Sequence, residues 1–130
     1  MKNEILSHLP GDFPWQVLWF HTLDSTNIQA KKMAQEGAAQ GTVLIAAEQT
    51  SGKGRLGRTF YSPDKAGIYL SVILRPNCKP DKLMHLTCRT AVAICDALEE
   101  VTGFRPSIKW INDITCNGKK LGGILTELSL

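Results

Sequence analysis

Residues 41–76 read GTVLIAAEQTSGKGRLGRTFYSPDKAGIYLSVILRP, and this stretch decides which kind of fold the chain can adopt. Two apolar runs within it, residues 42–47 and 68–74, are rich in β-branched and large apolar side chains and are bounded by glycine. Such runs are typical of β-strands. The polar segment that separates them cannot belong to the core, so it is expected to form an exposed loop between two strands.

This loop alternates glycine with cations over residues 51–58, SGKGRLGR. Glycine lets backbone N–H groups surround a ligand, and Lys53, Arg55 and Arg58 add up to three positive charges, so the loop suits a phosphate or a carboxylate. The alternative is a mobile, solvated connection, which is common for a glycine-rich loop of this length. The spacing matches neither the Walker phosphate loop nor the dinucleotide-binding G-x-G-x-x-G turn. Generic phosphate motifs therefore do not identify the loop.

Composition limits the classes of protein to consider. The 130 residues, 43% hydrophobic and 21% charged, predict one domain at most, with enough apolar residues for a core. The net charge of +3 is small and its cations gather in loops, which indicates local anion sites and no DNA-binding surface. Residues 1–14 are too short and too mixed for a signal peptide or a spanning helix, so a cytoplasmic protein without membrane contact is expected.

The four cysteines show no metal or disulfide pattern. Cys78, Cys88, Cys95 and Cys116 include no C-x-x-C pair and no flanking histidine arrangement. Neither a zinc site nor a disulfide framework is indicated, and reduced, mostly buried thiols are predicted.

Further strands and a helix are expected around this stretch. Residues 15–21 predict a strand with burial on both faces, and residues 68–74 predict a central strand. Thr26, with Gln29 three positions later, makes a capping box for a helix that runs to Gly37.

The second half of the chain predicts one long helix and a hairpin. Residues 81–101 are expected to form an amphipathic helix, capped by Asp81 and ended before Gly103, that covers the sheet. Its apolar stripe consists of Met84, Cys88, Ala91, Ile94, Cys95, Leu98 and Val101. Residues 107–110 and 121–128 predict strands, and Asn117-Gly118 is a strong signal for a two-residue hairpin turn.

Several short motifs, taken together, resemble the catalytic domain of biotin protein ligases. They follow the order and separations of that family, and the resemblance covers about residues 15 to 128. The motifs are Asp24-Ser25-Thr26-Asn27, Glu48-Gln49-Thr50-Ser51-Gly52-Lys53-Gly54-Arg55-Leu56-Gly57-Arg58, Tyr61-Ser62-Pro63, Leu70-Ser71 with Leu74-Arg75-Pro76, Lys109-Trp110-Ile111-Asn112-Asp113 and Lys119-Lys120-Leu121-Gly122-Gly123-Ile124-Leu125.

The resemblance implies an α+β fold, with a mixed, largely antiparallel β-sheet and helices packed on one face, as in class II aminoacyl-tRNA synthetases. Residues 1–14 would be a lead-in, and residues 15–130 the N-terminal portion of the catalytic domain. Some members carry a DNA-binding winged helix-turn-helix, for which there is no room ahead of Trp15. The family's domain continues beyond the point that corresponds to Leu130, so an incomplete sheet with an uncovered edge and apolar face is expected.

By the same resemblance, one set of residues is expected to contact biotin. The polar residues after the first strand would pair with the ureido head, which needs neutral hydrogen-bond partners, although a helix cap alone would also explain them. The lysine before Leu121 would reach the biotin carboxylate, unless it merely protects a hairpin edge. The expected biotin-binding residues are Ser25, Thr26, Asn27, Gln49, Lys53, Gly54, Arg55 and Lys120.

A second set is expected to contact ATP and the adenylate. Lys109 would approach the phosphates, and Asn112 with Asp113 would position the nucleotide, with Asp113 as a candidate Mg²⁺ ligand; Lys109 and Asp113 could otherwise form an ordinary surface pair. The expected residues are Arg55, Arg58, Phe60, Lys109, Asn112 and Asp113, and the expected catalytic residues are Lys120, Arg55 and Lys109.

Three positions depart from the family pattern. Lys53 stands where arginine is commoner and lacks the two-pronged hydrogen-bond geometry. Phe60 replaces a tryptophan, and Ile111 replaces a proline that would restrict the turn.

The resemblance therefore predicts an ATP-dependent ligase. It would activate biotin to biotinyl-5′-AMP, with Mg²⁺ screening the phosphates, and transfer biotin to a lysine of a biotin carboxyl carrier protein of acetyl-CoA carboxylase or another biotin-dependent carboxylase. Two alternatives remain: a lipoate or octanoate ligase of the same fold, and a truncated, non-catalytic remnant that binds biotin or only packs against a partner.

Overall fold

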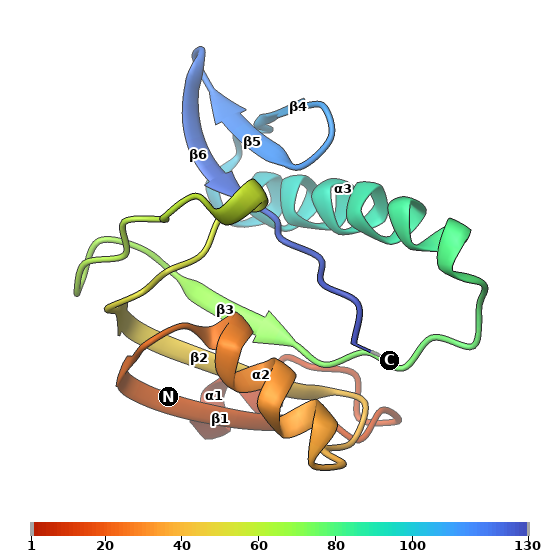
Figure 1. Ribbon diagram of the computed structural model, residues 1–130. Coiled ribbons are helices and arrows are strands. Elements are labelled where there is room, and N and C mark those ends of the chain that lie inside the picture. Colours follow the sequence, from red (N-terminus) through yellow and green to blue (C-terminus); the bar gives the residue numbers. More distant parts are fainter. Residues whose placement is uncertain (1, 130) are drawn as a thin grey trace. The chain divides into compact units, whose positions relative to one another are not determined.

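The computed structural model describes residues 2–129, and Figure 1 shows their course. The chain divides into two compact units. The N-terminal unit runs up to Pro76 and includes Ser129, and the C-terminal unit is Asn77–Leu128. The predicted α+β class, with mixed but mostly antiparallel strand pairing, is confirmed.

The N-terminal unit is built on a three-stranded sheet. Strands β1 (Gln16–Leu23), β2 (Thr42–Gln49) and β3 (Tyr69–Val72) lie in the order β1-β2-β3. β1 pairs parallel to β2, because helix α2 (Thr26–Gln35) provides the crossover, while β3 pairs antiparallel to β2. The central strand is therefore β2, and the prediction that residues 68–74 form the central strand is wrong.

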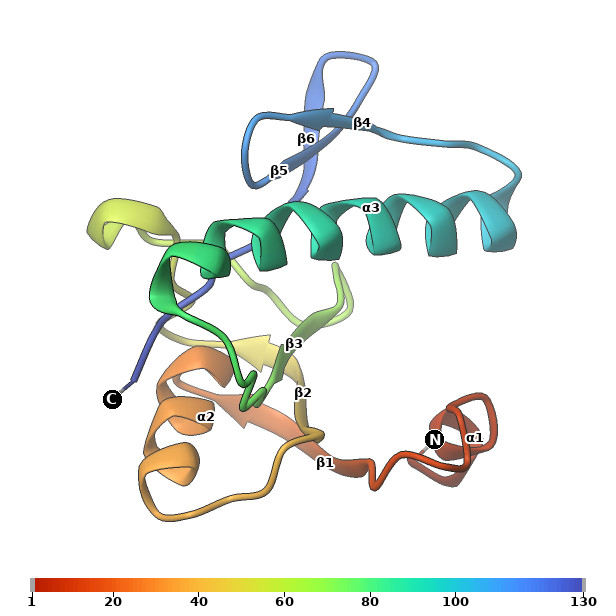
Figure 2. The same cartoon turned by 90° about the vertical axis from the view of Figure 1, so that its right-hand side faces the viewer.

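Two helices of this unit pack on opposite faces of the sheet. On one face, Val17, Val43 and Ile45 contact Ile5 and Leu6 of helix α1 (Lys2–Ser7). On the other face, α2 packs against a core that comprises Ala30, Leu44 and Ile73. Figures 1 and 2 show α1 and α2 on the two sides of the strands.

Strand β1 is not buried on both faces, contrary to the prediction. Val17 is fully buried, but Gln16, Trp19 and His21 are exposed. The reason is its position in the strand order, since β1 has a neighbouring strand on one side only among the described residues. The sequence of β1 is rich in large apolar residues, but several of their side chains lie partly in water.

Helix α2 begins close to the predicted residue but with a different cap. The N-cap is Ser25, whose side chain makes no cap hydrogen bond, so the predicted Thr26–Gln29 capping box is wrong. Instead, Asp24 Oδ1 accepts hydrogen bonds from the Ser25 backbone N–H at 2.6 Å and from Gln29 Nε2 at 3.0 Å. The side-chain hydrogen bond from Gln29 and the backbone bond from Ser25 lower the pKa of Asp24.

The C-terminal unit contains a long helix and a second three-stranded sheet. A 3-10 turn (Pro80–Lys82) leads into α3 (Leu83–Thr102), followed by β4 (Ser107–Lys109), β5 (Asp113–Cys116) and β6 (Lys119–Gly123). The strands lie in the order β4-β5-β6 and are antiparallel. The last strand ends at Gly123, so the predicted strand over residues 121–128 is wrong beyond that point.

The core of this unit confirms the middle of the predicted helical stripe. Ala91 and Cys95 of α3 pack against Ile114, with Ile94 and Leu98 beside them. The ends of the stripe are wrong, because Met84 is 58% and Val101 83% exposed. The predicted cap is wrong too, since the N-cap of α3 is Lys82 and not Asp81.

The two tight turns of this unit follow the prediction. Asn117 and Gly118 both have positive φ, 50° and 74°, as a two-residue hairpin turn of type I′ requires. Gly103, with φ 72°, ends α3 in the left-handed conformation.

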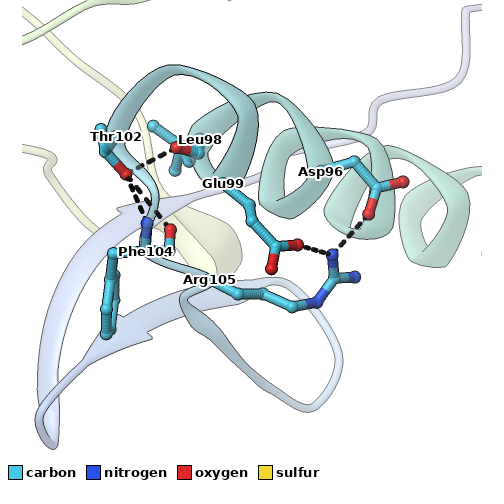
Figure 3. Close-up of polar contacts among 6 residues, drawn as sticks. All are labelled: Asp96, Leu98, Glu99, Thr102, Phe104 and Arg105. Carbon is cyan, nitrogen blue, oxygen red and sulfur yellow. Dashed lines mark hydrogen bonds and ion pairs between the residues drawn. The ribbon is translucent and has the colours of Figure 1, made fainter.

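The C-terminal end of α3 is secured by side chains, as Figure 3 shows. Thr102 Oγ1 donates a hydrogen bond to Leu98 O at 2.6 Å and accepts one from the Phe104 N–H at 3.2 Å. Arg105 Nη1 lies 2.6 Å from Asp96 Oδ1 and 2.8 Å from Glu99 Oε2. These contacts attach the segment before β4 to the helix, and the hydrogen bonds to Glu99 and Asp96 raise the pKa of Arg105 further above its ordinary range.

All four cysteines are free, as predicted, but only Cys95 is buried, and Cys78 is exposed. Among residues 2–129, no helix has the length and apolar character that a membrane crossing would need.

Candidate functional site

The glycine-rich loop after β2 is closed by backbone hydrogen bonds. Gln49 and Ser62 form an isolated antiparallel bridge, and Lys53 and Thr59 form another. The Phe60 N–H donates to Gly52 O at 2.7 Å. The segment between Gln49 and Ser62 is therefore a defined hairpin-like loop, whose backbone is held at several points.

The tip of this loop is a tight turn of cationic residues. Its 3-10 turn (Arg55–Gly57) places Leu56 and Gly57 at positive φ, 57° and 73°. A hollow of about 250 Å³ lies beside the turn. It is lined by Thr50, Ser51, Gly52, Lys53, Gly57, Arg58 and Thr59.

This hollow brings together two of the predicted anion-binding cations, Lys53 and Arg58. Neither Gly54 nor Arg55 is among its lining residues. Two cations beside a small hollow suit an oxyanion, so anion binding at this loop stays a prediction. The backbone N–H groups of Thr50, Ser51 and Arg58 already donate to carbonyl groups of the protein.

Thr26 and Gln49 form the centre of a buried polar cluster in the same unit. Gln49 Oε1 accepts hydrogen bonds from the Thr26 N–H at 2.8 Å and from Thr26 Oγ1 at 3.1 Å. Gln49 Nε2 donates to Ser62 Oγ at 2.9 Å. The side chain of Gln49, the last residue of β2, therefore joins the start of α2 to the end of the glycine-rich loop.

Ser71 of β3 connects Asn27, another predicted residue, to Thr26 of this cluster. Its hydroxyl lies 2.8 Å from Thr26 Oγ1 and 3.0 Å from Asn27 Oδ1 and can donate to either. Thr26 and Asn27 are thus oriented from a strand that lies far away in the sequence.

Ser25, the residue before Thr26, takes no part in the hydrogen bonds of this cluster. It is 1% exposed, and its Oγ has no hydrogen-bond partner among the described residues. An unpaired buried hydroxyl is unfavourable, which makes it a group that a polar ligand would satisfy.

Gly52 is required where the loop crosses this cluster. A Cβ at this position would lie 2.3 Å from Phe60 O, 2.6 Å from Ser62 Oγ and 3.1 Å from Gln49 Nε2. The glycine-rich sequence predicted that the loop backbone lies close to another group. At Gly52 that group is part of the protein itself, the polar atoms of Phe60, Ser62 and Gln49.

The predicted residues of the C-terminal unit lie at the start of its hairpin. Lys109 and Asp113 are directly opposite each other in the β4–β5 pairing. Lys120 Nζ lies 3.3 Å from Asp113 Oδ1, with side chains 50% and 27% exposed. Lys120 passes over Gly123, where an added Cβ would lie 3.3 Å from its Cε and Nζ.

Asn112 stabilises the same region through the segment after β6. Its Nδ2 donates to Ile124 O at 3.3 Å, and the Ile124 N–H donates to Asn112 O at 2.8 Å. Of the pair predicted to position the nucleotide, Asn112 is therefore held by Ile124 and Asp113 by its ion pair with Lys120.

Asp113 was the predicted metal ligand. Within residues 2–129, no group of three or more histidine, cysteine, aspartate or glutamate residues could hold a metal ion. The carboxylate of Asp113 is ion-paired with Lys120, and its role as a Mg²⁺ ligand stays a prediction.

The structure thus brings the predicted residues together in two groups. Thr26, Asn27 and Gln49 share one hydrogen-bonded cluster, with Ser25 next to Thr26 in the sequence but outside its hydrogen bonds, whereas Lys109, Asn112, Asp113 and Lys120 share the hairpin of the other unit. Phe60, expected to stack on a base, has a half-buried side chain, and its carbonyl accepts a hydrogen bond from Ser62.

Sequence reasoning assigned no role to Ser62 or Ser71, although both stood in the quoted motifs. A signal existed for Ser71, because it is a polar residue between Tyr69 and Ile73 on the side of β3 that faces the core. Tyr69 itself is buried, which raises the pKa of its phenol, and it donates to Pro63 O at 3.0 Å.

Comparison with known proteins gives consistent matches over nearly the whole chain. Residues 19–129 match the Biotin/lipoate A/B protein ligase family. The Bifunctional ligase/repressor BirA of Bacillus subtilis is 41% identical over 128 residues, which cover 98% of this chain and 39% of that protein. The Biotin--[acetyl-CoA-carboxylase] ligase of Paracoccus denitrificans is 39% identical over 109 residues, which cover 82% and 44%.

Among solved structures, the biotin protein ligase from Aquifex aeolicus in complex with biotin and ATP is similar in fold. The TM-score is 0.79 at 37% identity, and the match covers 90% of this chain and 48% of that protein. This chain therefore spans less than half the length of each of these relatives.

Proposed function

Because this chain belongs to the biotin/lipoate A/B protein ligase family, we propose that it contributes to a biotin protein ligase, which activates biotin with ATP and transfers it to a protein lysine. The observation that carries the choice of biotin is the polar cluster around Gln49 and Thr26, together with the buried, unpaired hydroxyl of Ser25, the residue before Thr26. Biotin's ureido head is neutral and rich in hydrogen-bonding groups, so it needs such partners.

Lipoate is less suited to this cluster. The distal end of lipoate is a dithiolane ring, which cannot satisfy a buried hydroxyl as a ureido group can. The lipoate ligase alternative therefore leaves Ser25 unexplained.

The charged residues have roles that follow from the first reaction. A carboxylate oxygen of biotin attacks the α-phosphorus of ATP, the bond to the pyrophosphate oxygen breaks, and biotinyl-5′-AMP and pyrophosphate form. Both reactants are anions and repel each other, so cations must neutralise them and hold them in line. We assign this role to Lys53, Arg55, Lys109 and Lys120, with Arg58 beside the hollow as a further phosphate contact.

In the second reaction, the neutral ε-amine of an acceptor lysine attacks the acyl carbon of the mixed anhydride. The amide bond forms, AMP leaves, and the amine loses a proton to solvent. The acceptor proposed here is a biotin carboxyl carrier protein of acetyl-CoA carboxylase or a related carboxylase.

Magnesium would enter this scheme with the nucleotide, with Asp113 as the candidate protein ligand. Asp113 is a single carboxylate that is paired with Lys120, and the described residues hold no cluster that would bind the ion by themselves. No step of the proposed reaction is therefore assigned to a metal held by this chain.

Calorimetric titration and a pyrophosphate assay test the proposal together. The chain is titrated with biotin and with lipoate, and pyrophosphate release is measured with Mg-ATP and each acid. Biotin-dependent release that is lost in Lys120→Ala and kept in Lys119→Ala is expected. Binding of biotin without release would indicate the non-catalytic alternative, and a folded chain that does not bind biotin contradicts the proposal.

A further inference from the structure

A continuous chain of hydrogen bonds crosses the N-terminal unit from the glycine-rich loop to β3. Ser62 Oγ donates to Phe60 O at 3.0 Å and accepts from Gln49 Nε2 at 2.9 Å. Gln49 Oε1 accepts from Thr26, and Thr26 Oγ1 lies 2.8 Å from the Ser71 hydroxyl. We call this set, Ser62, Gln49, Thr26 and Ser71, the polar relay.

The direction of the relay is fixed by one backbone group. The N–H of Thr26 can only donate, so the Gln49 atom that faces it at 2.8 Å must be the carbonyl oxygen. The amide nitrogen of Gln49 must then face Ser62, and Ser62 must accept that bond. The proton of Ser62 is consequently directed to Phe60 O, which leaves one consistent arrangement of donors and acceptors.

This arrangement determines what Gln49 can offer to a ligand. Its oxygen already accepts two hydrogen bonds from Thr26, which use both lone pairs. Its nitrogen uses one proton on Ser62 and keeps the second. Gln49 can therefore donate to a ligand but has no capacity left to accept from one.

Ser71 secures the other end of the relay. The Thr26 hydroxyl donates to Gln49, so its oxygen accepts from Ser71, which can alternatively donate to Asn27 Oδ1 at 3.0 Å. Without the Ser71 hydroxyl, Thr26 would lose its hydrogen bond from β3, because its other side-chain hydrogen bonds within residues 2–129 are to Gln49.

We propose that Ser62 and Ser71 are positioning residues that hold Gln49 and Thr26 so that Gln49 presents an N–H to an acceptor oxygen, the ureido carbonyl of biotin. Neither serine needs to touch the ligand in this scheme. The inference rests on the proposed function for the identity of the ligand, whereas the direction of the relay rests on the hydrogen bonds alone.

Biotin affinity, measured by calorimetry on the full chain, tests the role of the two serines. Ser62→Ala and Ser71→Ala are each expected to weaken binding about tenfold, the usual effect of one lost hydrogen bond. Ser71→Thr, which keeps the hydroxyl, should restore most of the affinity. Thr22→Val is the matched control, because it removes a hydroxyl that bonds Glu48 in the same sheet outside the relay.

Each result separates this inference from the proposed function. Unchanged affinity in both alanine variants, with biotin bound by the wild type, overturns the inference and leaves the proposed function intact. Equal losses in the alanine variants and in Thr22→Val would indicate general loosening of the sheet and would also overturn it. A wild-type chain that is folded but does not bind biotin overturns the proposed function and, with it, the assigned ligand.

The direction of the relay has its own test, which needs no ligand. In ¹⁵N-labelled protein, the two Nε2 protons of Gln49 should differ in chemical shift, with the one bonded to Ser62 protected from exchange with water. Ser62→Ala should remove that protection while the backbone amide spectrum stays folded. A Gln49 side-chain signal that does not respond to Ser62→Ala contradicts the relay whatever the ligand.

Discussion

The two units of this chain hold their predicted site residues in opposite ways. In the N-terminal unit, apart from the exposed cations Lys53, Arg55 and Arg58 of the glycine-rich loop, the groups are neutral, and Ser25, Thr26 and the neighbouring Ser62 are each no more than 2% exposed. In the C-terminal unit they are charged and lie in water, with Lys120 half exposed and 3.3 Å from its partner. Neutral hydrogen bonds depend on direction and on exclusion of water, whereas a charge acts over several ångströms without a fixed orientation.

This difference implies that site substitutions should affect stability in the N-terminal unit and only chemistry in the C-terminal unit. Directional recognition has to be built into the core, so the recognition residues also hold the fold. Charged residues at a hairpin can change without disturbing the core. The following substitutions test that contrast.

The largest effect is expected from Gly52→Ala. The new Cβ would lie 2.3 Å from the carbonyl oxygen of Phe60, so the loop backbone has to move. We expect a loss of about 1–3 kcal/mol in the free energy of unfolding, and loss of biotin binding because Ser62 and Gln49 move with it. Chemical denaturation and calorimetry measure the two effects.

Gly11→Ala is the control for this substitution, since no atom lies within 4 Å of its added Cβ. It should change stability by no more than about 0.5 kcal/mol. Equal unfolding midpoints for Gly52→Ala and wild type would show that the loop adapts freely and that the contrast is wrong.

The second-largest effect is expected from Gln49→Leu. The substitution keeps the approximate size of the side chain but leaves the N–H of Thr26 and the hydroxyl of Ser62, both buried, without their partner. A destabilisation of about 1–3 kcal/mol is expected from the unpaired groups. Gln16→Leu, at an exposed position of β1, provides the same exchange without buried partners, and urea denaturation of both variants gives the comparison.

Lys120→Ala should change stability little and activity strongly, the reverse of Gly52→Ala and Gln49→Leu. Its ion pair with Asp113 is partly exposed, so the free energy of unfolding should change by no more than about 0.5 kcal/mol. Biotin-dependent pyrophosphate release should fall by about 100-fold or more, the usual effect of removing a charge-stabilising donor. A large loss of stability in this variant, compared with Lys119→Ala, would contradict the contrast.

The smallest effect concerns acid stability. Hydrogen bonds from Gln29 and the Ser25 backbone hold the pKa of Asp24 below its usual value of 3.8. A carboxylate with a lowered folded-state pKa stabilises the fold above the unfolded value, and this contribution disappears as the pH falls through the folded value. Asp24→Asn should therefore flatten the pH dependence of the unfolding midpoint below about pH 4, which thermal unfolding across an acid pH series measures.

The sequence identified more of the elements than of their contacts. The strand at β2, the helix start near Thr26, the Asn117-Gly118 turn and the end of α3 at Gly103 depend on short-range patterns, and the structure contains each of them. The helix caps were wrong. At α2, the groups of the expected capping box have other partners, because the Thr26 N–H donates to Gln49 Oε1 and Gln29 Nε2 donates to Asp24 Oδ1.

The sequence by itself determined the family, the α+β class and the residues that carry charge, because these depend on residue type and local order. Only the tertiary structure decided the strand order that places β2 in the centre and the orientation of Gln49. Ser71 lies 45 positions from Thr26 in the sequence, and Ser62 lies 13 from Gln49. No local pattern encodes a hydrogen bond between such residues, since it forms only after the strands have paired in register.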